Sequence, residues 1–272
     1  GERRPETAVT PQEFSVIDQS CLPLSLQFSY DEYRVAPSVG FAVQEISVGR
    51  FASACISLQK SRSVVDNTAL AGLHIWCLLQ DHNLSAAQQL LNMAIAEFEV
   101  DQHLAYSGAI IHEQSGNHQL AHSLYSDLFA LNGEPMILEA CARTALASSQ
   151  SQRCLDCLDQ LLLATEVTPK HLTMRAAAFA QLDRYSESMA LLAHMLEDWP
   201  NDGELLLQTA FVAYDYAAAS SSLELYVDAA ILLRRIIELD PQNAAVFLPL
   251  ARCYAASGDF NESTLAFMRC LE

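Results

Sequence analysis

The sequence is poor in lysine and in residues that break secondary structure. It contains only two lysines, Lys60 and Lys170, and only nine glycines and nine prolines among 272 residues. Acidic residues outnumber basic ones by 33 to 15, which gives a formal net charge of −18. Because a nucleic-acid binder gains affinity by neutralising phosphates with Lys and Arg, this balance argues against DNA or RNA as the main partner. The low glycine and proline content, together with 51% hydrophobic residues, argues against a disordered chain.

Long apolar runs are also lacking. No run reaches the roughly 18 uninterrupted residues that a membrane span requires. The opening Gly1-Glu2-Arg3-Arg4-Pro5 is followed by polar residues and not by the apolar core of a signal peptide. We therefore predict a cytoplasmic protein without membrane insertion. Because the chain starts without Met and its repeats stop abruptly at Leu271-Glu272, we expect a piece of a longer protein.

Motifs of catalytic and metal sites are absent. There is no Gly-x-Ser-x-Gly elbow, no P-loop and no dinucleotide fingerprint. Cys154-Leu155-Asp156-Cys157 has the CxxC form, and His118 and His122 lie one helical turn apart. Neither has the second ligand pair nearby that zinc needs. We predict no catalytic residues, no cofactor and no metal, and only a composite site built from distant residues would escape this search.

The eight cysteines fit buried thiols better than disulfides. Seven of them lie inside apolar helical stretches, where a free cysteine behaves as a small hydrophobic side chain. These seven are Cys55, Cys77, Cys141, Cys154, Cys157, Cys253 and Cys270. A chain of this size needs no disulfide staples, so we expect reduced thiols and a reducing compartment.

A repeat of about 34 residues runs through most of the chain. Small residues suited to the crossing point of two helices recur at separations of 33, 34, 67, 41 and 34 residues. They are Ala54, Ala87, Ala121, Ser188, Ala229 and Ser263. The separations indicate one unit that lacks its small residue and another that carries seven additional residues.

Turn signals repeat with the same spacing. Four of the small residues are preceded by the same short pattern, a glycine or aspartate and then, two positions later, an aromatic or histidine side chain. The four stretches are Gly49-Arg50-Phe51, Gly116-Asn117-His118, Asp183-Arg184-Tyr185 and Gly258-Asp259-Phe260. Glycine at the end of a first helix supplies a left-handed cap, and the ring begins the packing of the second helix. This helical periodicity predicts more than about 70% helix and essentially no sheet.

The last unit resembles a tetratricopeptide repeat. The family pattern has a large aromatic, Leu, Gly or Ala, Tyr, Gly, Tyr, Ala, an aromatic and Ala. The matching residues are Phe247, Leu250, Ala251, Tyr254, Gly258, Phe260, Ser263, Phe267 and Cys270. Ser263 in place of Ala is a mild departure, because both residues let helices approach closely.

Extending this frame backward gives about seven units, at 35–66, 68–99, 102–133, 136–167, 169–200, 203–241 and 244–272. The unit at 136–167 is the poorest match, with Ser148-Ser149-Gln150-Ser151 at its turn. The unit at 203–241 holds the seven-residue excess around Ala217–Glu224, which lengthens its first helix or its turn. Residues 1–34 form a leader that is too apolar for a plain linker, and we expect part of it to pack on the first repeat or to occupy a groove. Its apolar residues are Leu22, Leu24, Leu26, Phe28, Tyr30 and Tyr33.

The resemblance implies an all-α, right-handed superhelical solenoid of antiparallel helix pairs over residues 35–272. In this family the concave groove is lined by the second, fifth, ninth and twelfth positions of each unit. The candidates here are Trp76, Leu79, Tyr106, Ile110, Thr173, Leu207, Phe211, Tyr214, Leu248 and Arg252. For each aromatic, packing between repeats is the alternative interpretation.

One subfamily clamps the carboxylate of chaperone tails with Lys, Arg and Asn, but here the groove positions are mostly apolar or small. The sequence therefore predicts a non-catalytic protein–protein interaction scaffold or adaptor, a subunit of a larger cytosolic multiprotein complex, that binds an apolar or amphipathic helix or extended segment. The alternatives are a helical-repeat nucleic-acid binder and a regulatory fragment of a larger enzyme. We also expect an exposed patch at the end of the chain, formed by Leu265, Phe267, Met268 and Leu271, and self-association through it.

Overall fold

The computed structural model describes residues 22–23, 26–27, 37–62 and 67–271. Of these residues 82% are helical, and none of them forms a strand. The all-α repeat architecture and the high helix content predicted from the sequence are confirmed. Within the described ranges, no helix is long and apolar enough to cross a membrane.

Within the described residues, fourteen α-helices form seven consecutive pairs. The N-terminal helices are α3 (Pro37–Ser47), α4 (Phe51–Arg62), α5 (Thr68–Gln80), α6 (Leu84–Glu97), α7 (Gln102–Gln114), α8 (His118–Asn132) and α9 (Pro135–Ala147). The remaining helices are α10 (Ser151–Ala164), α11 (Pro169–Gln181), α12 (Tyr185–Asp198), α13 (Gly203–Ser220), α14 (Leu223–Leu239), α15 (Phe247–Ser257) and α16 (Phe260–Leu271). A 3₁₀ turn at Ala244–Val246 precedes α15. The short connection within each pair makes its two helices antiparallel.

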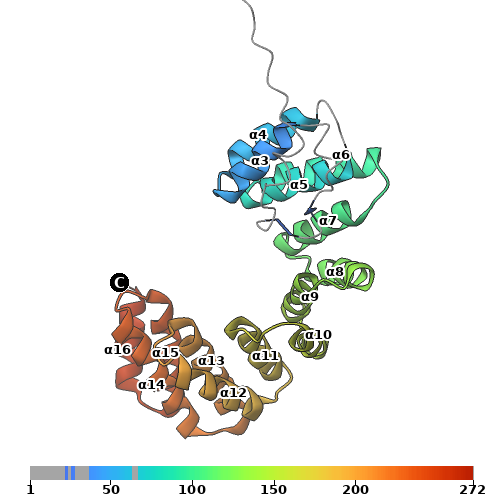
Figure 1. Ribbon diagram of the computed structural model, residues 1–272. Helices are drawn as coiled ribbons and strands as arrows, with labels where there is room; N and C mark the ends of the chain where they lie inside the picture. The colour runs from blue at the N-terminus through green and yellow to red at the C-terminus, as the bar shows by residue number, and fades with distance from the viewer. Residues whose placement is uncertain (1–21, 24–25, 28–36, 63–66, 272) are drawn as a thin grey trace, which may run out of the picture. The chain divides into compact units, whose positions relative to one another are not determined.

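The chain divides into two compact units, residues 1–144 and 145–272, which we call the N-terminal unit and the C-terminal unit. The division falls within α9. In each unit, helices that follow one another in sequence pack against one another, as α11 to α16 do in the orange and red part of Figure 1.

Each turn within a pair contains one residue in the left-handed region. In the N-terminal unit these residues are Gly49 (φ 75°), His82 (57°) and Gly116 (79°). In the C-terminal unit they are Ser149 (59°), Asp183 (58°), Ser221 (55°) and Gly258 (88°). A residue with a Cβ loses about 1–2 kcal/mol in this conformation, because its Cβ crowds the carbonyl oxygen. The turn is therefore a fixed feature of the repeat, even where the sequence offers no glycine.

The small residues found in the sequence lie at the helix crossings, because all six are at most 4% exposed. In the fourth pair, for which the sequence showed no small residue, Cys154 lies at the helix crossing. It is fully buried and follows the turn residue Ser149 by five positions. Where the crossing residue is serine, its hydroxyl bonds back to the first helix. Ser188 Oγ donates to Ala176 O at 2.8 Å and Ser263 Oγ to Ala251 O at 2.9 Å.

The seven additional residues lengthen both helices of the sixth pair. Helix α13 has 18 residues and α14 has 17, whereas the other first helices have 11 to 13. The lengthened end brings Tyr216 onto Tyr185 of α12, with ring centroids 5.6 Å apart and planes 15° apart. Tyr214 meets Tyr226 of α14 edge to face at 5.2 Å. The insertion therefore builds an aromatic cluster at this end of the pair.

Three hydrogen bonds join neighbouring first helices at the same separation of 35 residues. Ser107 Oγ donates to Gly72 O at 3.4 Å, Gln181 Nε2 to Leu146 O at 3.4 Å, and Gln208 Nε2 to Thr173 O at 2.9 Å. A fourth contact joins two helix starts, because Asp101 caps α7 through Oδ1 and accepts from Thr68 Oγ1 of α5 through Oδ2 at 2.6 Å. These four contacts each join a repeat to its neighbour.

Part of the leader reaches the core of the N-terminal unit. Leu22 is 3% exposed and belongs to the same hydrophobic cluster as Val43 of α3, Leu58 of α4 and Leu73 of α5. Leu26 is fully buried next to Gly72, where its Cδ2 would lie 3.3 Å from an added Cβ. Most of residues 1–34 lies outside the described residues.

Candidate protein-interaction surfaces

Two groove candidates of the N-terminal unit belong to its core. Leu79 is 2% exposed and Tyr106 is 7% exposed, so neither can contact a ligand on the surface. Tyr106 packs edge to face on Tyr125 at 6.1 Å, and burial raises the pKa of its hydroxyl to about 12. Neighbouring helices cover both side chains in this structure, and a role of these two residues in a groove stays a prediction.

The other two candidates of this unit are partly buried. Trp76 packs on the cluster formed by α3, α4 and α5, and meets Phe51 edge to face at 5.8 Å. Ile110 packs against the cluster formed by α5, α6 and α7. Much of the surface of both side chains is therefore buried in contacts between repeats.

An ion pair that the sequence analysis missed occupies one groove position of the N-terminal unit. Glu113, at the twelfth position of its repeat, accepts from Arg143 Nε at 2.5 Å and from Arg143 Nη2 at 3.0 Å. Tyr125 OH also donates to Glu113, at 3.0 Å. Burial, and next the nearby Glu113 carboxylate, raise the pKa of Tyr125, while the hydrogen bond to Glu113 raises the pKa of Arg143. Glu113, Tyr125 and Arg143 thus join α7, α8 and α9. Most of their hydrogen-bonding groups are used within the protein and are not available to a ligand.

The C-terminal unit exposes more of its groove candidates. Phe211 of α13 is 45% exposed, Leu248 of α15 is 38% exposed, and Arg252 of α15 is exposed as well. Among the described residues Arg252 has no ion pair or hydrogen bond through its side chain. Apolar surface and an available guanidinium therefore lie on two consecutive first helices.

The remaining three candidates of this unit are partly buried. Leu207 and Tyr214 pack against the cluster formed by α13, α14 and α15. Thr173 Oγ1 donates to Lys170 O at 2.9 Å, within its own helix. These three residues therefore add less exposed surface than Phe211 and Leu248 do.

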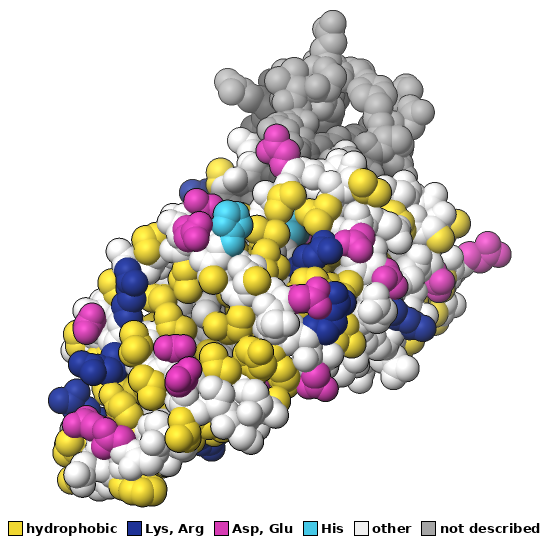
Figure 2. All heavy atoms as spheres, turned by 90° about the horizontal axis from the view of Figure 1, so that it is seen from below, with side chains coloured by type: hydrophobic (Ala, Val, Ile, Leu, Met, Phe, Trp, Pro, Cys, Tyr) yellow, Lys and Arg dark blue, Asp and Glu magenta, His cyan; other side chains and the backbone are white. Residues whose placement is uncertain are grey.

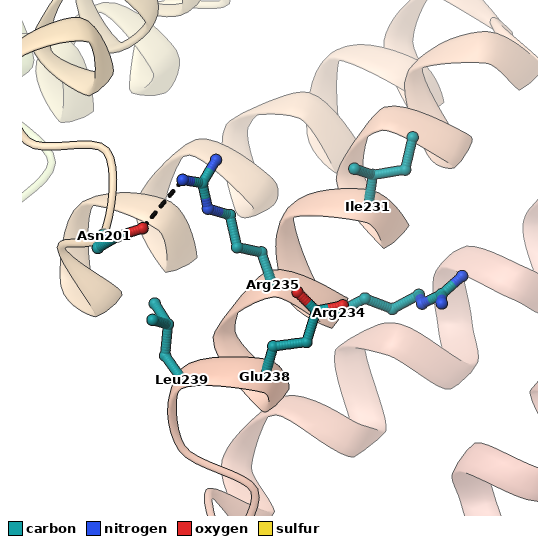
Figure 3. Close-up of a pocket in the computed structure, with 6 residues that line it drawn as sticks. All are labelled: Asn201, Ile231, Arg234, Arg235, Glu238 and Leu239. Carbon is teal, nitrogen blue, oxygen red and sulfur yellow. Dashed lines mark hydrogen bonds between the residues drawn. The ribbon is translucent and has the colours of Figure 1, made fainter.

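A pocket of about 580 Å³ lies beside α14 (Figure 3). It is lined by Asn201, Ile231, Arg234, Arg235, Glu238 and Leu239. Arg235 Nη2 donates to Asn201 Oδ1 at 2.9 Å, whereas Arg234 points away from Asn201. The sequence carried a signal for this surface, because the exposed Leu223, Val227 and Ile231 follow one another at intervals of four residues on α14.

A second pocket, of about 730 Å³, lies between α14, α15 and α16. Its lining includes Leu265, which is 56% exposed, and Met268, which is 58% exposed. Phe267 on the same helix is 41% exposed. These three residues of the expected terminal patch therefore present apolar surface, and the side chain of Leu271 lies outside the described residues. Self-association through the patch stays a prediction.

Charges on the described surface are mixed in sign. On the face seen in Figure 2, Lys and Arg side chains are interspersed with Asp, Glu and apolar side chains and do not form one continuous basic area. Four arginines follow residue 200, namely Arg234, Arg235, Arg252 and Arg269. A ligand of the C-terminal unit would therefore contact isolated positive charges beside apolar side chains.

None of the seven described cysteines forms a disulfide, and not all of them are buried. Cys270 is exposed, and Cys55 and Cys157 are partly buried. Burial raises the pKa of Cys154 to about 12 and that of Cys253 to about 11. The pKa of Cys55 is lowered to about 6, chiefly by a hydrogen bond with Cys77. Burial opposes this change, and His74 adds a smaller lowering contribution.

Potential metal ligands are scattered within the part of the chain that the structure describes. No group of three or more His, Cys, Asp or Glu residues there could hold a metal ion. His122 Nδ1 is 3.1 Å from Cys141 O, a contact that fixes its ring within the N-terminal unit. The side chain of Cys154 fills a helix crossing, as described above.

Comparisons with known proteins identify similar folds. Residues 222–264 match the tetratricopeptide repeat family. No curated protein sequence matches the chain. A solved tetratricopeptide repeat protein from Parabacteroides merdae is similar over 86% of this chain and 91% of its own, with a TM-score of 0.66 and 15% identity.

Two further solved structures are similar. The C-terminal part of a repeat-containing protein from Cytophaga hutchinsonii has a TM-score of 0.59 and 14% identity, covering 85% of this chain and 93% of its own. A human IFIT1 dimer with PPP-AAAA has a TM-score of 0.52 and 15% identity, covering 85% of this chain and 59% of its own. At these identities the likeness concerns the fold.

Proposed function

We propose that this helical repeat array of the tetratricopeptide type is a non-catalytic protein-binding scaffold, working as one subunit of a larger cytosolic assembly. The observation that carries the proposal is the exposure of Phe211 and Leu248 on the first helices α13 and α15. Exposed apolar patches mark partner contacts, and these two side chains lie on successive first helices of the array. Stacked repeats present their first helices on one concave surface, which suits a single extended or helical segment.

The chemistry of this surface restricts its ligand. Phe211 and Leu248 favour apolar side chains, and the unpaired Arg252 favours a carboxylate beside them. The ligand that fits is an amphipathic segment with an acidic residue next to its apolar face. The N-terminal unit contributes less to binding in this scheme, because its groove candidates Leu79 and Tyr106 are buried.

The test is affinity capture from the source cell with three immobilised chains. They are the natural chain, the double variant Phe211→Asp/Leu248→Asp, and the control Leu163→Asp, which alters a residue of α10 that is 90% exposed in the same unit. We expect a protein held by the natural chain and by the control to be lost from the double variant. Circular dichroism checks that all three chains are folded.

Binding of the captured protein, once purified, is then measured by calorimetry against the same three chains and against Arg252→Glu. Equal affinity for the natural chain and the double variant would overturn the proposed surface. Recovery of a partner only through bound nucleic acid, abolished by nuclease treatment, would favour the nucleic-acid alternative instead.

A further inference from the structure

Helix α14 exposes large apolar side chains where other second helices expose small or polar ones. Val227 and Ile231 lie two residues before and two residues after the crossing residue Ala229, and they are 48% and 58% exposed. In α6, α8, α10 and α12 the same two positions are also exposed, but they hold Ser85 and Gln89, Gln119 and Ser123, Gln152 and Asp156, and Ser186 and Ala190. Among the described helices before α14, Ile56 of α4 is the single large apolar side chain at either position. Packing within the array therefore does not explain Val227 and Ile231.

The apolar surface continues on the next second helix, α16. Leu265 occupies the position equivalent to Ile231 and is 56% exposed, and Met268 is 58% exposed. The pocket lined by Ile231 and the pocket lined by Leu265 and Met268 share Arg234 and Glu238, so the two apolar areas are adjacent. We call this area the second-helix surface, made of Leu223, Val227, Ile231, Leu265 and Met268.

Stacking of repeats does not cover this surface. Ile231 stays exposed although the whole repeat formed by α15 and α16 follows it. Leu265 has the same place in its own repeat, and Met268 has the place of the exposed Arg234. Phe267 differs, because its equivalent in α14 is Leu233, which is 1% exposed under the next repeat. We therefore leave Phe267 out of the second-helix surface.

Charges of opposite sign lie at the two ends of the second-helix surface. Second helices of successive repeats run in the same direction, so the N-terminal halves of α14 and α16 lie at one end. The exposed carboxylates at or just before these halves are Glu224, Asp228, Asp259 and Glu262. The C-terminal halves expose Arg234, Arg235 and Arg269, with Glu238 among them. Figure 3 shows that Arg234 and Arg235 extend to opposite sides of α14.

We propose that the second-helix surface binds an amphipathic helix of another protein, with acidic residues at its N-terminal end and basic residues at its C-terminal end. Its apolar face packs on Ile231 and Leu265. Charge complementarity places its acidic end at Arg234 and its basic end at Glu224 and Asp228. The bound helix therefore runs antiparallel to α14, and the macrodipole favours the same charge distribution in that helix.

This inference does not depend on the proposed function. The second-helix surface belongs to α14 and α16, whereas Phe211 and Leu248 lie on the first helices α13 and α15. The two surfaces also select different ligands, because Arg252 calls for a single acidic residue beside an apolar face. A helix with charges of opposite sign at its two ends matches the second-helix surface alone.

The first experiment measures the binding of a synthetic peptide to the full chain by fluorescence anisotropy. The peptide is a helix as long as α14, which has 17 residues, with leucines along one face, glutamates in its first turns and lysines in its last turns. We expect Ile231→Asp/Leu265→Asp to raise the Kd about tenfold, because exposed apolar contacts are lost. The matched control Phe211→Asp/Leu248→Asp makes the same chemical change on the first helices and should leave the Kd unchanged.

A second pair of variants tests the charges. Arg234→Glu should raise the Kd of the same peptide about fivefold, since it places a carboxylate beside the glutamates of the peptide. Arg252→Glu changes the net charge equally on the first helix α15, and its effect should stay below about twofold. A photoreactive group at the N-terminus of the peptide should cross-link to the C-terminal half of α14. Cross-linking near Leu223 instead would overturn the assigned direction.

Circular dichroism establishes that each variant is folded before its Kd is interpreted. A natural chain that does not bind the peptide would overturn the proposal. Loss of binding in Phe211→Asp/Leu248→Asp but not in Ile231→Asp/Leu265→Asp would also overturn it, by placing the peptide on the first helices. The same holds for a natural chain that light scattering shows to be a dimer and that Ile231→Asp/Leu265→Asp converts to a monomer, because a second copy would then cover the surface.

Discussion

The two units of this molecule use the same helix pair for different purposes. In the N-terminal unit the side chains at groove positions turn inward, as Leu79 and Tyr106 do, and the polar position at Glu113 is saturated by Arg143 and Tyr125. In the C-terminal unit Leu248 remains exposed at the position equivalent to Tyr106, and Phe211 remains exposed at another groove position. The repeat therefore determines the position of a side chain on its helix. The packing of neighbouring helices determines whether that side chain is buried in the core or exposed for binding.

The units also differ in how their turns are built. Two of the three left-handed turn residues in the N-terminal unit are glycines, whereas in the C-terminal unit only one of the four is a glycine. Ser149, Asp183 and Ser221 hold a conformation that costs each of them free energy. The C-terminal unit, which exposes the proposed binding surface, is also the one that carries more backbone strain.

The largest effect should come from truncating an aromatic residue in each unit. We expect Tyr106→Ala to lower the free energy of unfolding by about 3 kcal/mol, because it opens a cavity in the core. Phe211→Ala should cost about 1 kcal/mol or less, because nearly half of its side chain is already in water. Urea denaturation measures both. Similar losses would show that the two positions do not differ as described.

The next comparison concerns two carboxylates that each pair with an arginine. Glu113→Gln should lower the free energy of unfolding by about 2 kcal/mol, since it weakens three hydrogen bonds, two of them from a charged donor. Glu187 forms two hydrogen bonds with Arg184 at 2.6 Å, but both side chains are exposed. We expect no resolvable change for Glu187→Gln in the same denaturation assay. A larger loss for the second variant would refute this ranking.

Backbone strain in the C-terminal unit predicts a stabilising substitution. Ser149→Gly should raise the free energy of unfolding by about 0.5–1 kcal/mol, because glycine adopts a positive φ without a Cβ clash. The reverse change in the N-terminal unit, Gly116→Ser, should lower it by about 1 kcal/mol. Thermal and urea midpoints test the pair, and a destabilised Ser149→Gly variant would show that the serine side chain has a role of its own.

The smallest effect depends on pH. Burial raises the pKa of Asp215, which lies in the lengthened part of α13, above its ordinary value. The folded chain then holds this proton more tightly than the unfolded chain, so stability falls as pH rises from the unfolded pKa through the folded pKa. Asp215→Asn should therefore be more stable at pH 7, by at most about 0.5 kcal/mol after solvent screening. Below the unfolded pKa the difference should vanish, which denaturation at pH 3 and pH 7 would test.

The periodic part of this fold could be predicted from the sequence. Gly49, Gly116, Asp183 and Gly258 mark turns, and all four have the expected positive φ. Cys154 was not recognised as the crossing residue of the fourth repeat, because cysteine at this position differs from the alanine and serine of the others. Small size, and not residue type, was the property that mattered, since Cys154 is fully buried there.

Which groove positions are exposed could not be predicted in the same way. Tyr106 and Leu248 both occupy the fifth position of their repeats, but one is 7% and the other 38% exposed. Exposure depends on the size and approach of neighbouring helices, which no single repeat encodes.

The three hydrogen bonds that span 35 residues have a mechanical consequence. Each one links a side chain to the backbone carbonyl of the preceding first helix, at Gly72, Leu146 and Thr173. A pulling force that peels a repeat from its neighbour must break that link together with the apolar contact beneath it. Because donor and acceptor are uncharged, the force at which these repeats separate should hardly change with ionic strength.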